Sequence, residues 1–100
     1  MAERTQPNKI CRPREDLGIE RIEDDLLILD KRNQKVHQLN TTASVIWANI
    51  IAGQETDGIV REIVETFDIS PEVASQDVTR IVDEFCALGL LENPAEHSNH

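Results

Sequence analysis

The spacing of the apolar residues changes once along the chain, at Asn40, and this change limits the possible folds more than any other feature. Before Asn40 the apolar residues form short runs between acidic or turn-forming residues, which is typical of strands joined by hairpins. After Asn40 they recur at intervals of three and four residues, the period of an amphipathic helix. The sequence therefore predicts an α+β domain in which a sheet precedes the helices.

Strands are expected over Ile19–Glu23, Leu26–Asp30 and Lys35–Leu39. The middle segment is apolar on both faces, which places it firmly in the sheet. Lys35–Leu39 is more polar, as is typical of an exposed edge strand. We therefore expect a three-stranded antiparallel sheet with Lys35–Leu39 at one edge.

Helices are expected after Asn40, and each has a recognisable start and end. The predicted N-caps are Asn40, Thr56 and Ser70, and the predicted ends are Gly53, the Asp68–Ile69 corner and Gly89. Pro71 favours the third start, because the N–H group that proline lacks has no partner in the first turn of a helix. The prediction is a winged-helix-like domain, in which the three-stranded sheet is followed by a three-helix bundle that covers one of its faces.

A chain of 100 residues fits one small domain, and its two ends look different from the middle. Residues 1–16 are polar and charged, with few apolar side chains that could be buried, so we expect a flexible N-terminal arm. Residues 93–100 are equally polar and are expected to form a flexible tail. The folded domain is then predicted over residues 17–92.

The charge of the chain argues against a nucleic-acid partner. Asp and Glu total 19 and Lys and Arg 10, so the formal net charge is −9 and phosphate backbones are repelled. A helix-turn-helix would place the third predicted helix in DNA, yet that helix exposes mainly acidic side chains. An acidic winged-helix regulator, or a protein-interaction scaffold, remains the alternative to the function favoured below.

No segment resembles a signal peptide or approaches the roughly 20 apolar residues of a membrane span, so a cytoplasmic protein without a membrane partner is expected. Cys11 and Cys86 lie far apart and have no metal-ligand spacing, which predicts no metal or cofactor. His37 has no serine or cysteine nucleophile that could be paired with it from the sequence. Trp47 falls on an apolar helical stripe, which favours a core residue over one that stacks on a ligand. Catalysis is therefore not predicted.

An open edge at Lys35–Leu39 would offer unpaired backbone groups to an added peptide strand. On the third predicted helix, Val73, Asp77, Arg80 and Glu84 follow one another at intervals of four, three and four residues and share a ridge. A ridge beside a free sheet edge would form a groove for an extended peptide. The alternative is that Asp77, Arg80 and Glu84 only pair with one another on a solvated helix.

A set of residues in a fixed order resembles the pattern of PqqD-like proteins, which are precursor-peptide recognition elements. These residues are Leu39-Asn40, Ala43, Ile46-Trp47, Gly53, Thr56, Ile59, Phe67, Asp77-Val78, Phe85, Leu88 and Gly89-Leu90-Leu91. The resemblance covers about Leu26 to Glu92. The Leu39–Ala43 junction is more similar to the broad PqqD-like group than to the members devoted to pyrroloquinoline quinone.

The resemblance implies a non-catalytic peptide chaperone. It would bind the leader of a ribosomal precursor peptide by strand addition and present it to a modifying enzyme: a radical S-adenosylmethionine enzyme, a protease or a cyclase. The implied peptide-binding residues are Val36, His37, Gln38 and Leu39 on the strand and Val73, Asp77, Arg80, Ile81 and Glu84 on the helix. A homodimer is a further possibility, because an open edge and a loose arm both permit strand exchange.

Overall fold

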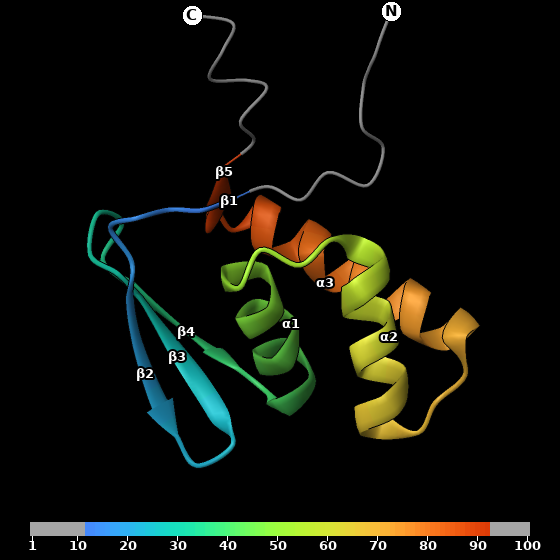
Figure 1. The fold of residues 1–100 in the computed structure, drawn as a ribbon. Coiled ribbons are helices and arrows are strands. Elements are labelled where there is room, and N and C mark those ends of the chain that lie inside the picture. The colour runs from blue at the N-terminus through green and yellow to red at the C-terminus, as the bar shows by residue number, and fades with distance from the viewer. Residues whose placement is uncertain (1–11, 93–100) are drawn as a thin grey trace, which may run out of the picture.

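The chain forms a three-stranded antiparallel sheet followed by three helices, and a short two-stranded ribbon joins the two ends of the domain (Figure 1). The structure is a computed structural model and describes residues 12–92. The elements are β1 (Arg12–Pro13), β2 (Gly18–Ile22), β3 (Asp25–Asp30), β4 (Lys35–Leu39), α1 (Thr41–Ile51), α2 (Thr56–Phe67), α3 (Pro71–Ala87) and β5 (Leu91–Glu92). The predicted α+β, winged-helix-like architecture is confirmed.

The sheet has the strand order β2-β3-β4, so β3 is central and β4 is an edge strand, as predicted. Ile28 in β3 pairs with Ile19 on one side and with His37 on the other. Leu26, Ile28 and Asp30 are buried, and the residues between them point to the opposite face. The sheet therefore has one face toward the helices and one away from them.

Local signals mark the helix ends. The Asn40 side chain accepts a hydrogen bond from the Ala43 N–H at 2.9 Å, and Ser70 does the same for the Val73 N–H at 3.2 Å. Gly89 follows α3 with a φ of 78°, and the N–H of Leu90 reaches the Phe85 carbonyl, which completes a Schellman motif. These starts and ends agree with the sequence.

The predicted N-cap of α2 is wrong by one residue. The cap is Glu55, whose side chain makes no capping hydrogen bond, and Thr56 is the first residue of the helix. Thr56 is a good capping residue, but the backbone is already helical at its position. The first strand is also shifted by one residue toward the N-terminus, since Gly18 pairs with Leu29 and β2 ends at Ile22.

The core lies between the sheet and the helices. α1 contacts β3 and β4, while α2 packs against α3. Trp47 of α1 meets Phe85 of α3 edge to face, with ring centroids 5.2 Å apart, and Trp47 is almost fully buried. Ile51, the last residue of α1, and Leu88, the residue that follows α3, are apolar but exposed at the ends of these helices.

The expected N-terminal arm is wrong for residues 12–16, which belong to the folded domain. β1 pairs with β5, so that Pro13 lies opposite Leu91, and the Arg14 side chain is buried. The polar composition of residues 1–16 does not reveal this burial, because the buried partner of Arg14, Asp30, is 16 residues away in the sequence. The predictions for residues 1–11 and for the tail 93–100 lie outside the described residues.

Candidate functional site

A groove of about 510 Å³ runs between the open edge strand β4 and one flank of α3. Its lining comes from β4, from the first turn of α1 and from α3: Val36, His37, Gln38, Leu39, Asn40, Thr42, Ala43, Asp77, Arg80, Ile81, Glu84, Phe85 and Leu88. Within the described residues β4 pairs with β3 alone, so its other side faces the groove region without a strand partner. The groove therefore combines a free sheet edge with a helical wall.

A buried serine fixes the position of β4 relative to α1. The Ser44 hydroxyl donates to the Leu39 carbonyl at 3.0 Å and accepts from the Leu26 N–H at 3.1 Å. Leu26 and Leu39 face each other across β3 and β4, so Ser44 ties the start of α1 to both strands at once. The end of the edge strand is therefore held rigidly where it meets the groove.

The wall that α3 contributes carries charges. Arg80 reaches Asp77 at 3.5 Å and Glu84 at 3.4 Å, one turn away on either side. The Arg80 and Glu84 side chains are well exposed, so these pairs contribute little to stability and exchange readily for other partners. Among the described residues that line the groove, Arg80 is the only Arg or Lys.

The β4 side of the groove offers both apolar and polar groups. Val36 is 62% exposed, which is unusual for a large apolar side chain on a strand. The Nε2 atom of His37 is buried and has no hydrogen-bond partner in the described part of the chain. Gln38 donates to Asp25 at 3.0 Å and so is turned toward β3. Val36 and His37 are thus the strand side chains with unused contacts.

The structure brings together eight of the nine residues predicted for the site. Val73 is the exception: it is exposed in the first turn of α3 and does not line the groove. Asn40, Thr42 and Ala43 were missed, although the strand-to-helix junction at Asn40 could have indicated them. Phe85 and Leu88 also line the groove, although they were named only among the residues that resemble the family pattern and not as binding residues. Whether any of these residues bind peptide remains a prediction.

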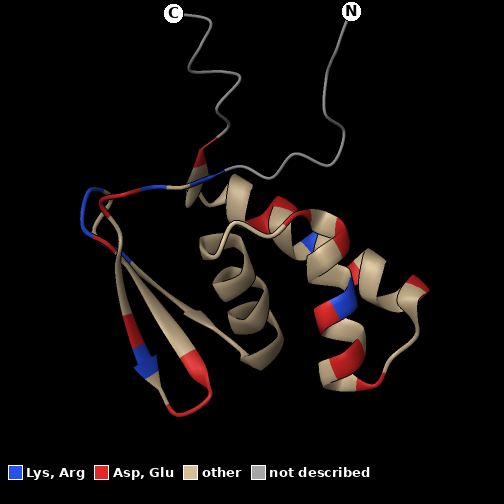
Figure 2. Cartoon of the chain, viewed as in Figure 1, with Lys and Arg blue, Asp and Glu red and all other residues tan. Residues whose placement is uncertain are grey.

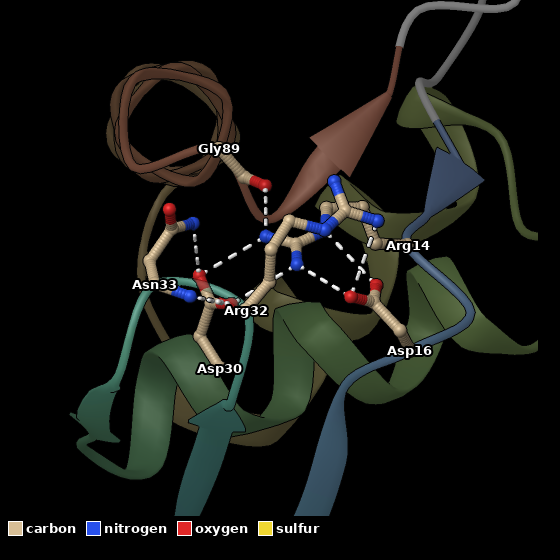
Figure 3. Close-up of polar contacts among 6 residues, drawn as sticks. All are labelled: Arg14, Asp16, Asp30, Arg32, Asn33 and Gly89. Atoms are coloured by element: carbon tan, nitrogen blue, oxygen red, sulfur yellow. Dashed lines mark hydrogen bonds and ion pairs between the residues drawn. The ribbon is translucent and has the colours of Figure 1, made fainter.

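A buried ion-pair cluster lies away from the groove, around Arg14 (Figure 3). The Arg14 guanidinium donates to both oxygens of Asp30 at 3.0 Å, to Asp16 and to the Gly89 carbonyl. Hydrogen bonds from Arg14 and then Asn33 hold the pKa of Asp30 far below its usual range. The pKa of Arg14 is raised by Asp16 and Asp30, so both groups stay charged. The cluster joins parts of the fold and is not arranged for proton transfer.

Other kinds of site find no support among residues 12–92. No three His, Cys, Asp or Glu side chains there gather closely enough to hold a metal ion. None of the helices in this part of the chain is both long and apolar enough to cross a membrane. Cys86 is exposed, and Cys11 lies outside the described residues.

Two solved structures share this fold. A chain described as TbiB1 in complex with the TbiA(beta) leader peptide matches with a TM-score of 0.76 and 18% identity, covering 81% of this chain and 94% of its own. A lasso peptide synthetase B1 complexed with the leader peptide matches with a TM-score of 0.73 and 20% identity, covering 79% and 93%. No curated protein matches the chain.

The family model described as coenzyme PQQ synthesis protein D (PqqD) matches residues 25–91. The match begins at β3 and ends at the first residue of β5, so it contains both walls of the groove. It also contains the Asn40 junction and the Gly89 helix end on which the resemblance in the sequence rests. The chain therefore belongs to the PqqD family.

Proposed function

We propose that this domain binds the leader segment of a ribosomally made precursor peptide, which adds as a strand to the free side of β4. The observation that carries the proposal is the groove itself, in which an unpaired sheet edge faces the charged flank of α3. Added strands bind through backbone hydrogen bonds, and the pockets beside them select alternate side chains. Here His37, Arg80 and Leu88 are among the residues that line the groove beside that edge.

The structural neighbours support this proposal. Both are described as complexes with a leader peptide, and both share the fold over most of their length. In this chain, Ser44 holds the end of β4 in a fixed position before any peptide arrives. A preformed edge lowers the entropy that must be lost when the peptide orders on it.

The proposed role is non-catalytic. The domain would hold the leader and present the rest of the precursor to a modifying enzyme, either a radical S-adenosylmethionine enzyme, a protease or a cyclase. It would act in the cytoplasm, where precursor peptides are translated. A domain with this role needs a binding surface and no catalytic residues, and the groove offers such a surface in a strand edge, apolar side chains and the charged Asp77, Arg80 and Glu84.

An NMR titration of the ¹⁵N-labelled protein tests the proposal. The probes are synthetic leader segments of the short peptides encoded beside the gene, and scrambled versions of the same peptides serve as controls. We expect saturable shifts of the amides of β4 and of α3 from Asp77 to Leu88, and none for the scrambled peptides. Shifts confined to other elements, or none with any leader while the spectrum stays folded, would favour the acidic regulator instead.

A further inference from the structure

The turn between β3 and β4 is a basic island in an acidic chain. Residues 31–35 contain Lys31, Arg32 and Lys35 and no acidic residue, whereas the whole chain has a formal net charge of −9. All three basic residues are exposed, and we call them the basic turn. The basic turn lies at one end of the sheet, and the acidic turn between β2 and β3 lies at the other (Figure 2).

The basic turn adjoins one end of the groove. Arg14 donates to Asp30, which pairs with Lys35 across the sheet. The same guanidinium donates to the Gly89 carbonyl, just after α3. The first residue of β4 therefore lies at the same end of the domain as the end of α3. The lining of the groove begins with the next residue of β4, Val36, so Lys35 is placed just outside the groove.

Two of the three positive charges of the basic turn have no partner in the fold. Arg32 pairs with Asp16 at 3.2 Å. Lys31 and Lys35 form no ion pair within residues 12–92. The carboxylate of Asp30, the strand partner of Lys35, is buried and bonded to the guanidinium that also holds the end of α3.

Other acidic residues also lie at this end of the domain. Glu84 of the helical wall reaches Arg80 at 3.4 Å. Glu15 and Glu92 line a separate hollow together with Arg32, and the lysines of the basic turn do not line it. The positive charge of the two lysines is therefore open to a group that arrives from outside the domain.

The opposite end of the groove is acidic. α3 lines the groove back to Asp77, roughly 16 Å along the helix from Leu88. The pair of Asp77 with Arg80 is long, at 3.5 Å, and exposed, so it cancels the negative charge only in part. Near the C-terminal end of β4, the Asp25 carboxylate accepts a hydrogen bond from the Gln38 side chain, and the two residues before Asp25 are acidic as well. A strand added to β4 therefore runs between a basic end and an acidic end.

A strand on the free side of β4 brings one of its own side chains opposite Lys35. Residues directly opposite each other in a sheet lie on the same face, where opposite charges stabilise the pair and like charges destabilise it. A carboxylate at that position would meet the Lys35 ammonium without displacing an ion-pair partner from residues 12–92. Lys31, in the adjoining turn, adds a second positive charge at this end.

We propose that the bound leader is acidic at the end that lies beside Lys35, and that Lys31 and Lys35 bind its carboxylates. This inference rests on the proposed function and specifies the chemistry of the leader. A chain with a net charge of −9 repels an acidic peptide over most of its surface, so the basic turn is the place where carboxylates are attracted. The charges thereby also set the direction of the leader, with its acidic segment away from Asp25 and Asp77.

Calorimetry with synthetic leader segments of the short peptides encoded beside the gene tests the two lysines. One variant carries Lys31→Gln and Lys35→Gln. The matched control carries Arg21→Gln and Arg61→Gln, which remove the same charge at exposed positions on β2 and α2, away from the groove. At low salt we expect the dissociation constant to rise roughly three- to tenfold in the lysine variant and by less than about twofold in the control.

The amide shifts of β4 in the NMR titration separate two kinds of failure. Equal affinities of the two variants, for a leader that shifts these amides, would overturn this inference and leave the proposed function standing. Leaders that shift no β4 amide would overturn both. Self-association of the lysine variant with unchanged leader affinity would mean that the lysines only protect an open sheet edge.

Neutral leaders test the chemistry of the contact. When the Asp and Glu residues of a leader segment are replaced by Asn and Gln, the lysine variant and the control should bind it equally, because no carboxylate remains for the lysines. Raising the salt concentration should likewise reduce the difference between the variants for the unchanged leader, since salt screens exposed charges. A loss of affinity that persists with the neutral leader, or leaders that bind β4 but contain no Asp or Glu, would overturn the inference.

Discussion

Arg14 and Asp30 share two hydrogen bonds of 3.0 Å, and both side chains are almost completely shielded from solvent. Arg14 precedes β2, and Asp30 ends β3. The same guanidinium also donates to the Gly89 carbonyl at 3.0 Å, just after α3 (Figure 3). One side chain thus joins the N-terminal segment, the sheet and the end of the last helix.

Replacing Arg14 with Met should destabilise the fold strongly, because it leaves the Asp30 carboxylate buried without its cation. We expect the melting temperature to fall by on the order of 10 °C. Arg32→Met is the control, since Arg32 is 63% exposed and pairs only at the surface with Asp16. Thermal unfolding followed by circular dichroism measures the melting temperatures of both variants. An equal fall in the two melting temperatures would contradict a special role for Arg14.

Asp30 should make stability depend on pH in the acid range. Folding lowers its pKa, so its contribution is complete above the unfolded value of about 3.9 and is lost as the pH falls toward the lower folded value. The free energy of unfolding should therefore fall below about pH 4, and less steeply in Asp30→Asn. Urea unfolding between pH 2 and pH 7 measures both slopes. If the free energy of unfolding fell equally with pH in both proteins, the loss of stability in acid would not come from Asp30.

Much of the fold could be predicted because its signals are local. Asn40 and Gly89 mark helix ends through the backbone conformations and hydrogen bonds of their own segments. The burial of Arg14 carries no such signal, since the partners that hold it in the fold, Asp30 and the Gly89 carbonyl, lie 16 and 75 residues away. A charged residue in a polar segment looks the same whether it is solvated or buried against a distant carboxylate.

The candidate site could be predicted as a strand and a helix facing each other, but not in its details. Helical spacing places Asp77, Arg80 and Glu84 on one flank, and the structure turns that flank toward β4. Val73 shares the spacing but lies beyond the end of the groove, because spacing does not say how far along a helix the neighbouring strand reaches.

Ser44→Ala should loosen the groove and the core together. The substitution removes the hydroxyl that joins the Leu26 N–H to the Leu39 carbonyl, and both lie in a buried region. We expect the free energy of unfolding to fall by about 1–3 kcal/mol. Ser75→Ala, on the exposed side of α3, is the matched control and should change it by less than about 0.5 kcal/mol.

Hydrogen exchange distinguishes the local effect of Ser44→Ala from general destabilisation. The amides at the C-terminal end of β4 should exchange faster in Ser44→Ala than in the control, and by a larger factor than those of α2, because the Ser44 hydroxyl bonds Leu26 and Leu39 of the sheet. Uniform acceleration throughout the domain would mean that Ser44 does not specifically fix the edge strand.

Asp68→Gly should stabilise the domain. Asp68 ends α2 with a φ of 56°, in the left-handed region where a side chain is strained, and its carboxylate lies at the negative end of the helix dipole. Glycine relieves both effects, and we expect a gain of about 1 kcal/mol in the free energy of unfolding. Chemical denaturation measures this gain in the free energy of unfolding. Asp57→Gly at the first turn of the same helix should instead destabilise, and gains in both would contradict the explanation.

Arg80→Ala should weaken leader binding without unfolding the domain, on the proposal that the leader occupies the groove. Arg80 is the only Arg or Lys among the described lining residues, and its two surface ion pairs are long enough to be exchanged for an acidic leader side chain. We expect a roughly two- to fivefold rise in the dissociation constant, measured by calorimetry with the leader peptides.

Arg61→Ala is the matched control for Arg80→Ala, because Arg61 is an exposed arginine on α2, away from the groove. Raising the salt concentration should reduce the difference between the two variants, since salt screens an exposed ion pair. Two results would contradict the prediction, each for a different reason. Equal affinity of both variants at low salt would leave Arg80 as a solvated partner of Asp77 and Glu84, whereas tighter binding by Arg80→Ala would mean that the groove receives a basic leader side chain.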